Sequence, residues 1–196
     1  MKTIVTTTFI FLLSAFVSAS HAANWPNWRG PNHDGSTISK KSPPVKFDVK
    51  NGVKWSTRLP GPSAATPIVL DDRVFASSVE ITDKKSGKGK LLAICLDRAS
   101  GKILWDRNAG SGYRPGKGDG FDYQLDSRTT YASHSPVTDG NVVVFFYGNG
   151  DLVTYDMGGK ELWRRNVQKE YGDFCFQWTF ASSPTLYGGK LYLPIL

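Results

Sequence analysis

A phrase that ends in Trp occurs twice in this 196-residue chain and constrains its fold more than any other feature. "CLDRASGKILW" runs from Cys95 to Trp105, and the shorter "TYDMGGKELW" runs from Thr154 to Trp163. In both copies an apolar segment leads to an Asp, a Gly-Lys turn follows, and an apolar pair precedes the Trp. Such self-similarity is typical of repeat architectures, in which similar supersecondary units stack beside one another.

A second phrase recurs as "ATPIVLDDRVF", "HSPVTDGNVVV" and "SSPTLYGGKLY". Alignment of Pro67, Pro136 and Pro184 places a turn pair at the same distance after each proline. These pairs are Asp71-Asp72, Gly140-Asn141 and Gly188-Gly189. Because Gly, Asn and Asp tolerate the positive φ of tight hairpins, each phrase predicts two short strands joined by a turn.

Together the two phrases predict units of four antiparallel strands, and the sequence after the first 22 residues shows no helical periodicity. Four-stranded units that repeat at about 40–50 residues indicate an all-β fold, a β-propeller of four-stranded antiparallel blades. The predicted blades cover residues 64–107 and 133–167, and a third begins at 181–196. A lone strand at 53–59, around Trp55, is predicted to complete the last blade and close the ring.

The Trp phrase resembles the repeat of quinoprotein propellers, whose consensus is Ala-x-Asp-x-x-Thr-Gly-Lys-x-x-Trp. The matching positions are Asp97, Gly101, Lys102 and Trp105 in the first copy, and Asp156, Gly159, Lys160 and Trp163 in the second. The stretch "NWPNWRGPNHDG" also resembles the N-terminus of exported bacterial proteins that carry these repeats. By this resemblance the chain is identified as an N-terminal fragment of a PQQ-like (pyrroloquinoline quinone-like) repeat protein of the quinoprotein/BamB-like superfamily.

The resemblance implies structural roles for the repeated residues. In that family the Trp docks one blade onto the next, which implies docking roles for Trp55, Trp105 and Trp163 and for the turn residues of the same phrases. A large flat ring fills the space between twisted radial sheets, so the implication is physically reasonable. Asp97 and Asp156 lie at hairpin turns, where a carboxylate usually accepts hydrogen bonds from backbone N–H groups.

The resemblance also brings a cofactor into consideration. The same repeat builds quinone-dependent alcohol dehydrogenases, in which adjacent cysteines lie over the quinone and carboxylate and amide groups hold calcium. In this chain Cys95 and Cys175 are far apart in sequence, and no matching catalytic motif can be placed. The stretch "GDGFDYQLD", with Asp119, Asp122 and Asp126, lacks the dense alternation and final Glu of a calcium loop.

Residues 1–22 read as a signal peptide, with Lys2 before an apolar run and small residues at the cleavage positions next to Ala22. Residues 23–52 are then an extended N-terminal segment of the exported protein, which we place in the periplasm or outside the cell. The apolar run is shorter than the roughly 20 residues that a membrane span needs, so no transmembrane segment is predicted. No Cys follows the cleavage position, so the sequence is not that of a lipoprotein.

Without Lys2 the chain has 23 Lys and Arg against 17 Asp and Glu, a net charge of +6. The densest basic run, Lys84 to Lys90, has no interleaved aromatic residues, so nucleic-acid binding is not predicted. The run is instead predicted to be a solvated loop. Attraction to an anionic glycan or to a membrane surface remains open. No cluster of His, Cys and Asp has the spacing of metal ligands. Cys95 lies in an apolar strand pattern, which favours a buried thiol.

One histidine stands out because it lies just before the proline of the second recurring phrase. His134 lies two residues before Pro136, on a segment that leads into an innermost strand. Innermost strands line the central channel of a propeller, so His134, with Tyr131 and Arg128, is a candidate channel-mouth site. The alternative is a histidine with an ordinary structural role.

The leading functional hypothesis is an exported, non-catalytic propeller that serves as a binding or scaffold module, with an envelope protein or a glycan as its partner. The alternative is a PQQ-dependent dehydrogenase whose active-site residues lie mostly beyond Leu196, in which case PQQ and calcium would be its cofactors. Closed propellers have about 4–8 blades and about two and a half are counted here, so we expect the natural protein to continue past Leu196.

Overall fold

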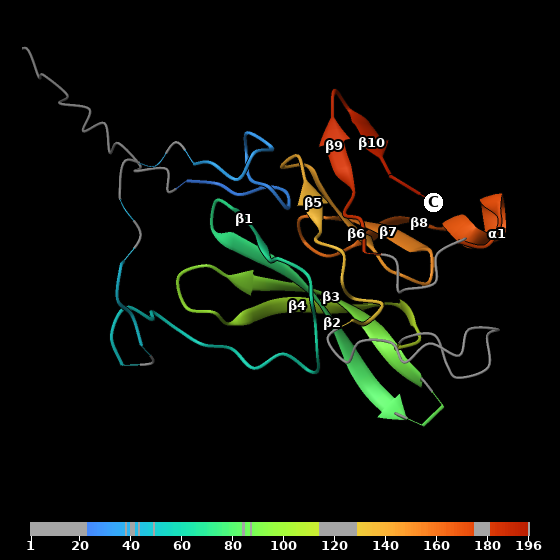
Figure 1. Ribbon diagram of the computed structural model, residues 1–196, viewed down its shortest axis with the longest axis horizontal. Coiled ribbons are helices and arrows are strands. Elements are labelled where there is room, and N and C mark those ends of the chain that lie inside the picture. The colour runs from blue at the N-terminus through green and yellow to red at the C-terminus, as the bar shows by residue number, and fades with distance from the viewer. Residues whose placement is uncertain are drawn as a thin grey trace, which may run out of the picture.

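The structure is a computed structural model of the chain. It describes residues 23–37, 39, 42, 44–48, 50–83, 85–86, 88–113, 129–174 and 181–195. The predicted signal peptide, Arg128, Cys175 and the Asp119–Asp126 stretch lie outside these ranges. Within them the chain is almost entirely β-structure, arranged as two four-stranded antiparallel sheets and a two-stranded hairpin (Figure 1). The predicted all-β fold with four-stranded units is confirmed.

Both four-stranded sheets are simple meanders, in which each strand pairs with its neighbour in sequence. The first sheet contains β1 (Ile68–Leu70), β2 (Arg73–Asp83), β3 (Lys88–Asp97) and β4 (Ile103–Ser111). The second contains β5 (Val137–Thr138), β6 (Val142–Phe146), β7 (Asp151–Asp156) and β8 (Glu161–Asn166). A single-turn helix, α1 (Val167–Tyr171), follows β8. The hairpin of β9 (Thr185–Tyr187) and β10 (Lys190–Tyr192) begins a third unit.

The turn pairs predicted after the three aligned prolines join the first two strands of each unit. Asp71, Gly140, Gly188 and Gly189 all have positive φ, between 50° and 95°. Gly and Asp tolerate this backbone region, which explains the residue types at these turns. The prediction of a loop is wrong for Lys88 to Lys90, which belong to β3, and Lys90 forms an ion pair of 3.0 Å with Glu80 of β2.

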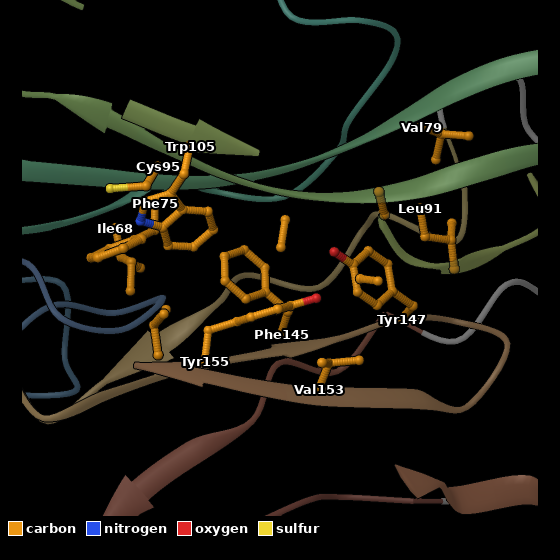
Figure 2. Close-up of a cluster of buried hydrophobic side chains, with 14 of the residues drawn as sticks. Ile68, Phe75, Val79, Leu91, Cys95, Trp105, Phe145, Tyr147, Val153 and Tyr155 are labelled. Atoms are coloured by element: carbon orange, nitrogen blue, oxygen red, sulfur yellow. The ribbon is translucent and has the colours of Figure 1, made fainter. Parts of the chain in front are cut away.

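The main apolar core lies between the two four-stranded sheets. Figure 2 shows the side chains of both sheets pointing toward one another across this space. Alternate residues of each strand supply them, as the period of two in a β-strand requires. The buried side chains drawn from the two sheets include Ile68, Phe75, Val79, Leu91, Cys95, Trp105, Phe145, Tyr147, Val153 and Tyr155.

Trp105 packs against aromatic rings of both sheets within this inter-sheet core. It is 7% exposed, and its ring centroid lies 6.0 Å from that of Phe75 in its own sheet. The centroids of Tyr155 and Phe145 in the second sheet lie at 5.8 and 6.5 Å. Trp105 is paired directly with Cys95 across β3 and β4, so the two side chains lie on the same face of the sheet. The predicted inter-blade role of Trp105 therefore agrees with its packing.

Trp105 also holds the turn of the following sheet. Its Nε1 donates a hydrogen bond of 3.2 Å to the Met157 carbonyl oxygen, and Arg107 Nε donates one of 2.7 Å to the Gly159 carbonyl oxygen. A Cβ atom at Gly159 would lie 2.7 Å from the ring of Trp105. Since Gly159 also has a φ of +84°, only glycine fits this contact without strain.

Trp55 makes the same contact one sheet earlier. Its Nε1 donates to the Arg98 carbonyl oxygen at 2.8 Å, and Thr57 Oγ1 donates to the Gly101 carbonyl oxygen at 2.6 Å. A Cβ atom at Gly101 would lie 2.4 Å from the Trp55 ring. Residues 53–59 nevertheless pair with no strand among the described residues, so ring closure by this segment stays a prediction.

A second contact between units runs through hydroxyl groups that precede the aligned prolines. Ser135 Oγ accepts a hydrogen bond of 3.0 Å from the Thr66 amide, and Ser183 Oγ accepts one of 3.0 Å from the Ser135 amide. Thr66, Ser135 and Ser183 occupy equivalent places before Pro67, Pro136 and Pro184. We call this pair of bonds the hydroxyl ladder. It joins the segments that lead into the first strands of the three units, which we call the entries of the units.

The hydroxyl ladder predicts the effect of one truncation. Ser135→Ala leaves the Thr66 amide without its acceptor and should lower the free energy of unfolding by about 1–2 kcal/mol. Urea unfolding of the natural protein measures this change. Ser182→Ala, which removes a neighbouring hydroxyl outside the ladder, is the control and should change stability by less than about 0.5 kcal/mol. Equal effects of the two variants would contradict a stabilising role for the ladder.

Candidate functional site at the entries of three units

A cleft lies where the segments that lead into β1, β5 and β9 meet the N-terminal segment. It has a volume of about 640 Å³. One wall is the loop Asn27–His33, and the other is formed by the residues that lead into β1, β5 and β9, with Pro194. The described lining residues are Asn27, Trp28, Arg29, His33, Ala64, Thr66, Ser133, Ser135, Ala181, Ser182, Ser183, Pro184, Thr185 and Pro194.

The N-terminal segment reaches this place because it adds to the edges of both sheets. Trp25 exchanges two backbone hydrogen bonds with Val69 of β1, at 2.7 and 2.9 Å, and the Pro26 carbonyl oxygen accepts from the Thr138 amide of β5 at 3.0 Å. Asn24 caps the β1–β2 turn through the Asp71 amide at 2.8 Å. Figure 1 shows this blue segment beside β1 and β5. The predicted extended segment is thus anchored at its start.

The loop that follows is fixed by its own backbone. Gly35 donates to the Arg29 carbonyl oxygen at 2.9 Å, and Gly30 to that of Asn27 at 3.0 Å. Gly30 has a φ of +75°, and a Cβ atom there would lie 2.7 Å from the Trp25 ring. His33 is one of two non-glycine residues with positive φ among those described, at 59°. The loop therefore presents its side chains from a preformed backbone.

The structure corrects the predicted position of His134. Its side chain is 1% exposed and packs edge-on against Phe146, with ring centroids 4.8 Å apart. Ser133 and Ser135 line the cleft, whereas His134 is not among the described lining residues and packs its ring on Phe146 instead. The prediction that His134 reaches a channel mouth is therefore wrong, although the segment that carries it does border the cleft.

Tyr131 is half-buried at the junction of the two sheets. Its amide donates to the Tyr113 carbonyl oxygen at 2.8 Å, and its carbonyl oxygen accepts from Gly148 at 2.9 Å. Its ring covers Gly112, where a Cβ atom would lie 2.8 Å away. The proposed grouping of His134, Tyr131 and Arg128 is not formed as a cleft-lining set by the two members that the structure describes.

The Asp residues of the repeat phrase hold turns, as the sequence predicted. Asp97 Oδ1 accepts from the Ser100 amide at 2.7 Å, and Asp156 Oδ1 accepts from the Lys160 amide at 2.9 Å. Hydrogen bonds from Ser100 hold the pKa of Asp97 below its usual value. The backbone of Lys102 closes the first turn, where its carbonyl oxygen accepts from the Asp97 amide, while its side chain is exposed.

The sequence predictions for Cys95 and Trp163 differ in how they compare with the structure. Cys95 is a fully buried free thiol, as predicted, and burial raises its pKa to about 11. Trp163 is 41% exposed on β8, and no described glycine turn lies against its ring. Its docking role stays a prediction. The Lys160 side chain, like that of Lys102, is exposed.

The lining of the cleft limits its chemistry. Its described residues offer hydroxyls, one carboxamide, one guanidinium, one imidazole and one indole, but no carboxylate and no thiol. Calcium prefers several oxygen ligands that include carboxylates, so this donor set does not suit calcium or the calcium-bound quinone of the dehydrogenases. Among the described residues no group of three or more His, Cys, Asp and Glu is placed to hold a metal ion. Within the same ranges, no helix has the length and apolar character that a membrane crossing requires.

The burial of His134 generates a pH prediction. Desolvation lowers its pKa to about 3 against an ordinary value of 6.5, although a hydrogen bond with the Tyr131 backbone raises it slightly. The unfolded chain therefore binds a proton between these values that the folded chain does not, so stability is lost as the pH falls below 6.5.

Between pH 7 and 4.5, replacement of His134 by Asn should remove about 2–3 kcal/mol of the pH-dependent loss of stability. Urea unfolding of the natural protein and the variant at both pH values measures this difference. The same pH dependence in the two proteins would mean that His134 is not kept neutral by burial.

Comparisons with known proteins agree with the repeat architecture. Residues 45–193, more than half of the chain, match a family model described as outer membrane protein assembly factor BamB. No curated protein matches the chain significantly in sequence.

Two solved structures are similar to the chain. The crystal structure of BamB from Moraxella catarrhalis has 16% sequence identity and a TM-score of 0.33, over 66% of this chain and 40% of that one. A europium-containing methanol dehydrogenase has 16% identity and a TM-score of 0.25, over 50% of this chain and 23% of that one. The chain thus spans less than half the length of either protein. On the strength of the family match, the chain belongs to the PQQ-like repeat family of the outer membrane protein assembly factor BamB.

Proposed function

We propose that this protein is an exported, non-catalytic β-propeller module that binds or scaffolds an envelope protein. Export rests on the signal-like residues 1–22, and the scaffold role rests on membership of a family whose model is described as an assembly factor. The observation that supports the proposal is that the described reactive side chains of the repeats are buried or hold turns.

The repeats contain several described side chains that could take part in catalysis, and each of them has a structural role instead. The carboxylates of Asp97 and Asp156 accept hydrogen bonds from the amides of their own turns. The Cys95 thiol is buried and stays protonated at neutral pH, so it is a poor nucleophile. His134 is buried and neutral, which leaves it without access to a substrate. These assignments favour binding over catalysis.

The PQQ-dependent dehydrogenase is the competing interpretation, and the described residues do not favour it. A quinone site of that kind needs carboxylate ligands for its calcium ion, and the described lining of the cleft has none.

Two experiments on the natural protein test the proposal. The tagged protein, cross-linked in its own cells, should co-purify with a discrete envelope protein. A matched variant without residues 2–22 should lose this partner, because it would not be exported. In the second experiment, spectral titration of the purified protein with PQQ and calcium should show no saturable binding, and no alcohol should be oxidised.

Two results would contradict the proposal. Stoichiometric quinone binding with alcohol oxidation would replace it by the dehydrogenase function. Recovery of the same proteins with the exported and the unexported forms would remove the basis for an envelope partner.

A further inference from the structure

Part of the cleft wall carries hydroxyl groups whose donors have no described partner. Ser135 is 1% exposed, and its Oγ accepts from the Thr66 amide. Ser183 Oγ likewise accepts from the Ser135 amide. Neither hydroxyl donates to another described residue, whereas Ser133 Oγ donates to the Thr130 carbonyl oxygen at 2.6 Å. A hydroxyl has one donor, and a buried donor without an acceptor is unfavourable, so this wall favours a ligand rich in acceptor oxygens.

The wall formed by the Asn27–His33 loop offers a cation that lies over an aromatic ring. Trp28 is 55% exposed, and the guanidinium carbon of Arg29 lies 5.6 Å from its ring centroid. The Trp28 carbonyl oxygen accepts from Trp25 Nε1 at 3.4 Å, and Arg29 Nη2 donates to the Asp34 carbonyl oxygen at 3.4 Å. The second bond is long and goes to a neutral acceptor, so the guanidinium retains donors for a carboxylate.

The charges of the cleft lining indicate which charge a ligand should carry. Arg29 is the only Lys, Arg, Asp or Glu among the described residues of the lining. The chain after residue 22 also carries a net charge of +6. The cleft therefore favours an anion over a cation. Its volume of about 640 Å³ falls in the range of small-molecule sites, roughly 300–1,000 Å³.

We infer that this cleft binds an acidic sugar, such as a uronic acid unit of a glycan. The apolar face of the sugar ring packs on Trp28, its carboxylate pairs with Arg29, and its hydroxyl oxygens accept from Ser135 and Ser183. Each group thus meets a side chain of matching chemistry, and the fixed loop backbone keeps the ordering cost of binding low. This inference goes beyond the proposed scaffold function and does not depend on an envelope protein partner.

Calorimetric titration of the natural full-length protein tests the inference. The probes are galacturonic acid trimer and the neutral galactose trimer of equal size. The acidic trimer should bind saturably and at least about tenfold more tightly, because a charge-assisted hydrogen bond is stronger than a neutral one. Its affinity should fall as NaCl is raised, since Arg29 is exposed to solvent.

Two exposed arginines supply a matched pair of variants. Arg29→Gln should weaken binding of the acidic trimer by about tenfold or more, and Arg58→Gln, outside the described cleft lining, should leave it unchanged. Trp28→Ala should weaken binding of both trimers, because it removes the apolar surface. Unfolding curves establish that each variant is folded.

Three results would overturn the inference. One is equal affinity for the acidic and neutral trimers. Another is an equal loss in the Arg29 and Arg58 variants, which would indicate attraction to overall charge alone. The third is tighter, Arg29-dependent binding of an acidic tripeptide, which would assign the cleft to a peptide. Capture of an envelope protein, or failure to capture one, affects none of these outcomes.

Discussion

The contact between a tryptophan ring and a glycine turn determines how the sheets of this protein stack. Trp55 meets the turn at Gly101, and Trp105 meets the turn at Gly159. In each case the indole N–H donates to a turn carbonyl oxygen, and the residue two positions later donates to the glycine carbonyl oxygen. The contact leaves no room for a side chain at the glycine. The distance between the ring and the turn therefore requires glycine at that position.

The cleft follows from this stacking. Once Trp105 fixes the first sheet against the second, the segments that lead into β1 and β5 lie close enough for the hydroxyl ladder to form. The ladder continues to Ser183 of the third unit, so the segments that lead into β1, β5 and β9 together form one polar wall of the cleft. The N-terminal segment pairs with Val69 and then crosses this wall with its Trp28–Arg29 loop. A surface with binding chemistry thus results from contacts that first serve the fold.

The sequence predicts the strands and turns better than it predicts the direction in which a particular side chain points. Asp97 and Gly101 have few alternative roles, because a short loop between apolar strands needs an acceptor and a residue with positive φ; the structure confirms both. His134 was placed on the wrong side because proximity to Pro136 does not determine which face a residue takes. The hydroxyl ladder was missed, although Thr66 and Ser135 before aligned prolines were its visible signal. Docking of Trp25 on β1 depends on long-range pairing, which no local pattern contains.

A double-mutant cycle between Trp105 and Gly159 tests the central claim most directly. Unfolding free energies are measured for the natural protein, Trp105→Ala, Gly159→Ala and the double variant. With Trp105 present, the new Cβ atom meets the ring and also adopts an unfavourable φ; without the ring, only the φ strain remains. The account predicts that Gly159→Ala costs about 1–3 kcal/mol less in the Trp105→Ala background. Additive effects, within about 0.5 kcal/mol, would show that the ring and the turn do not hold the two sheets together.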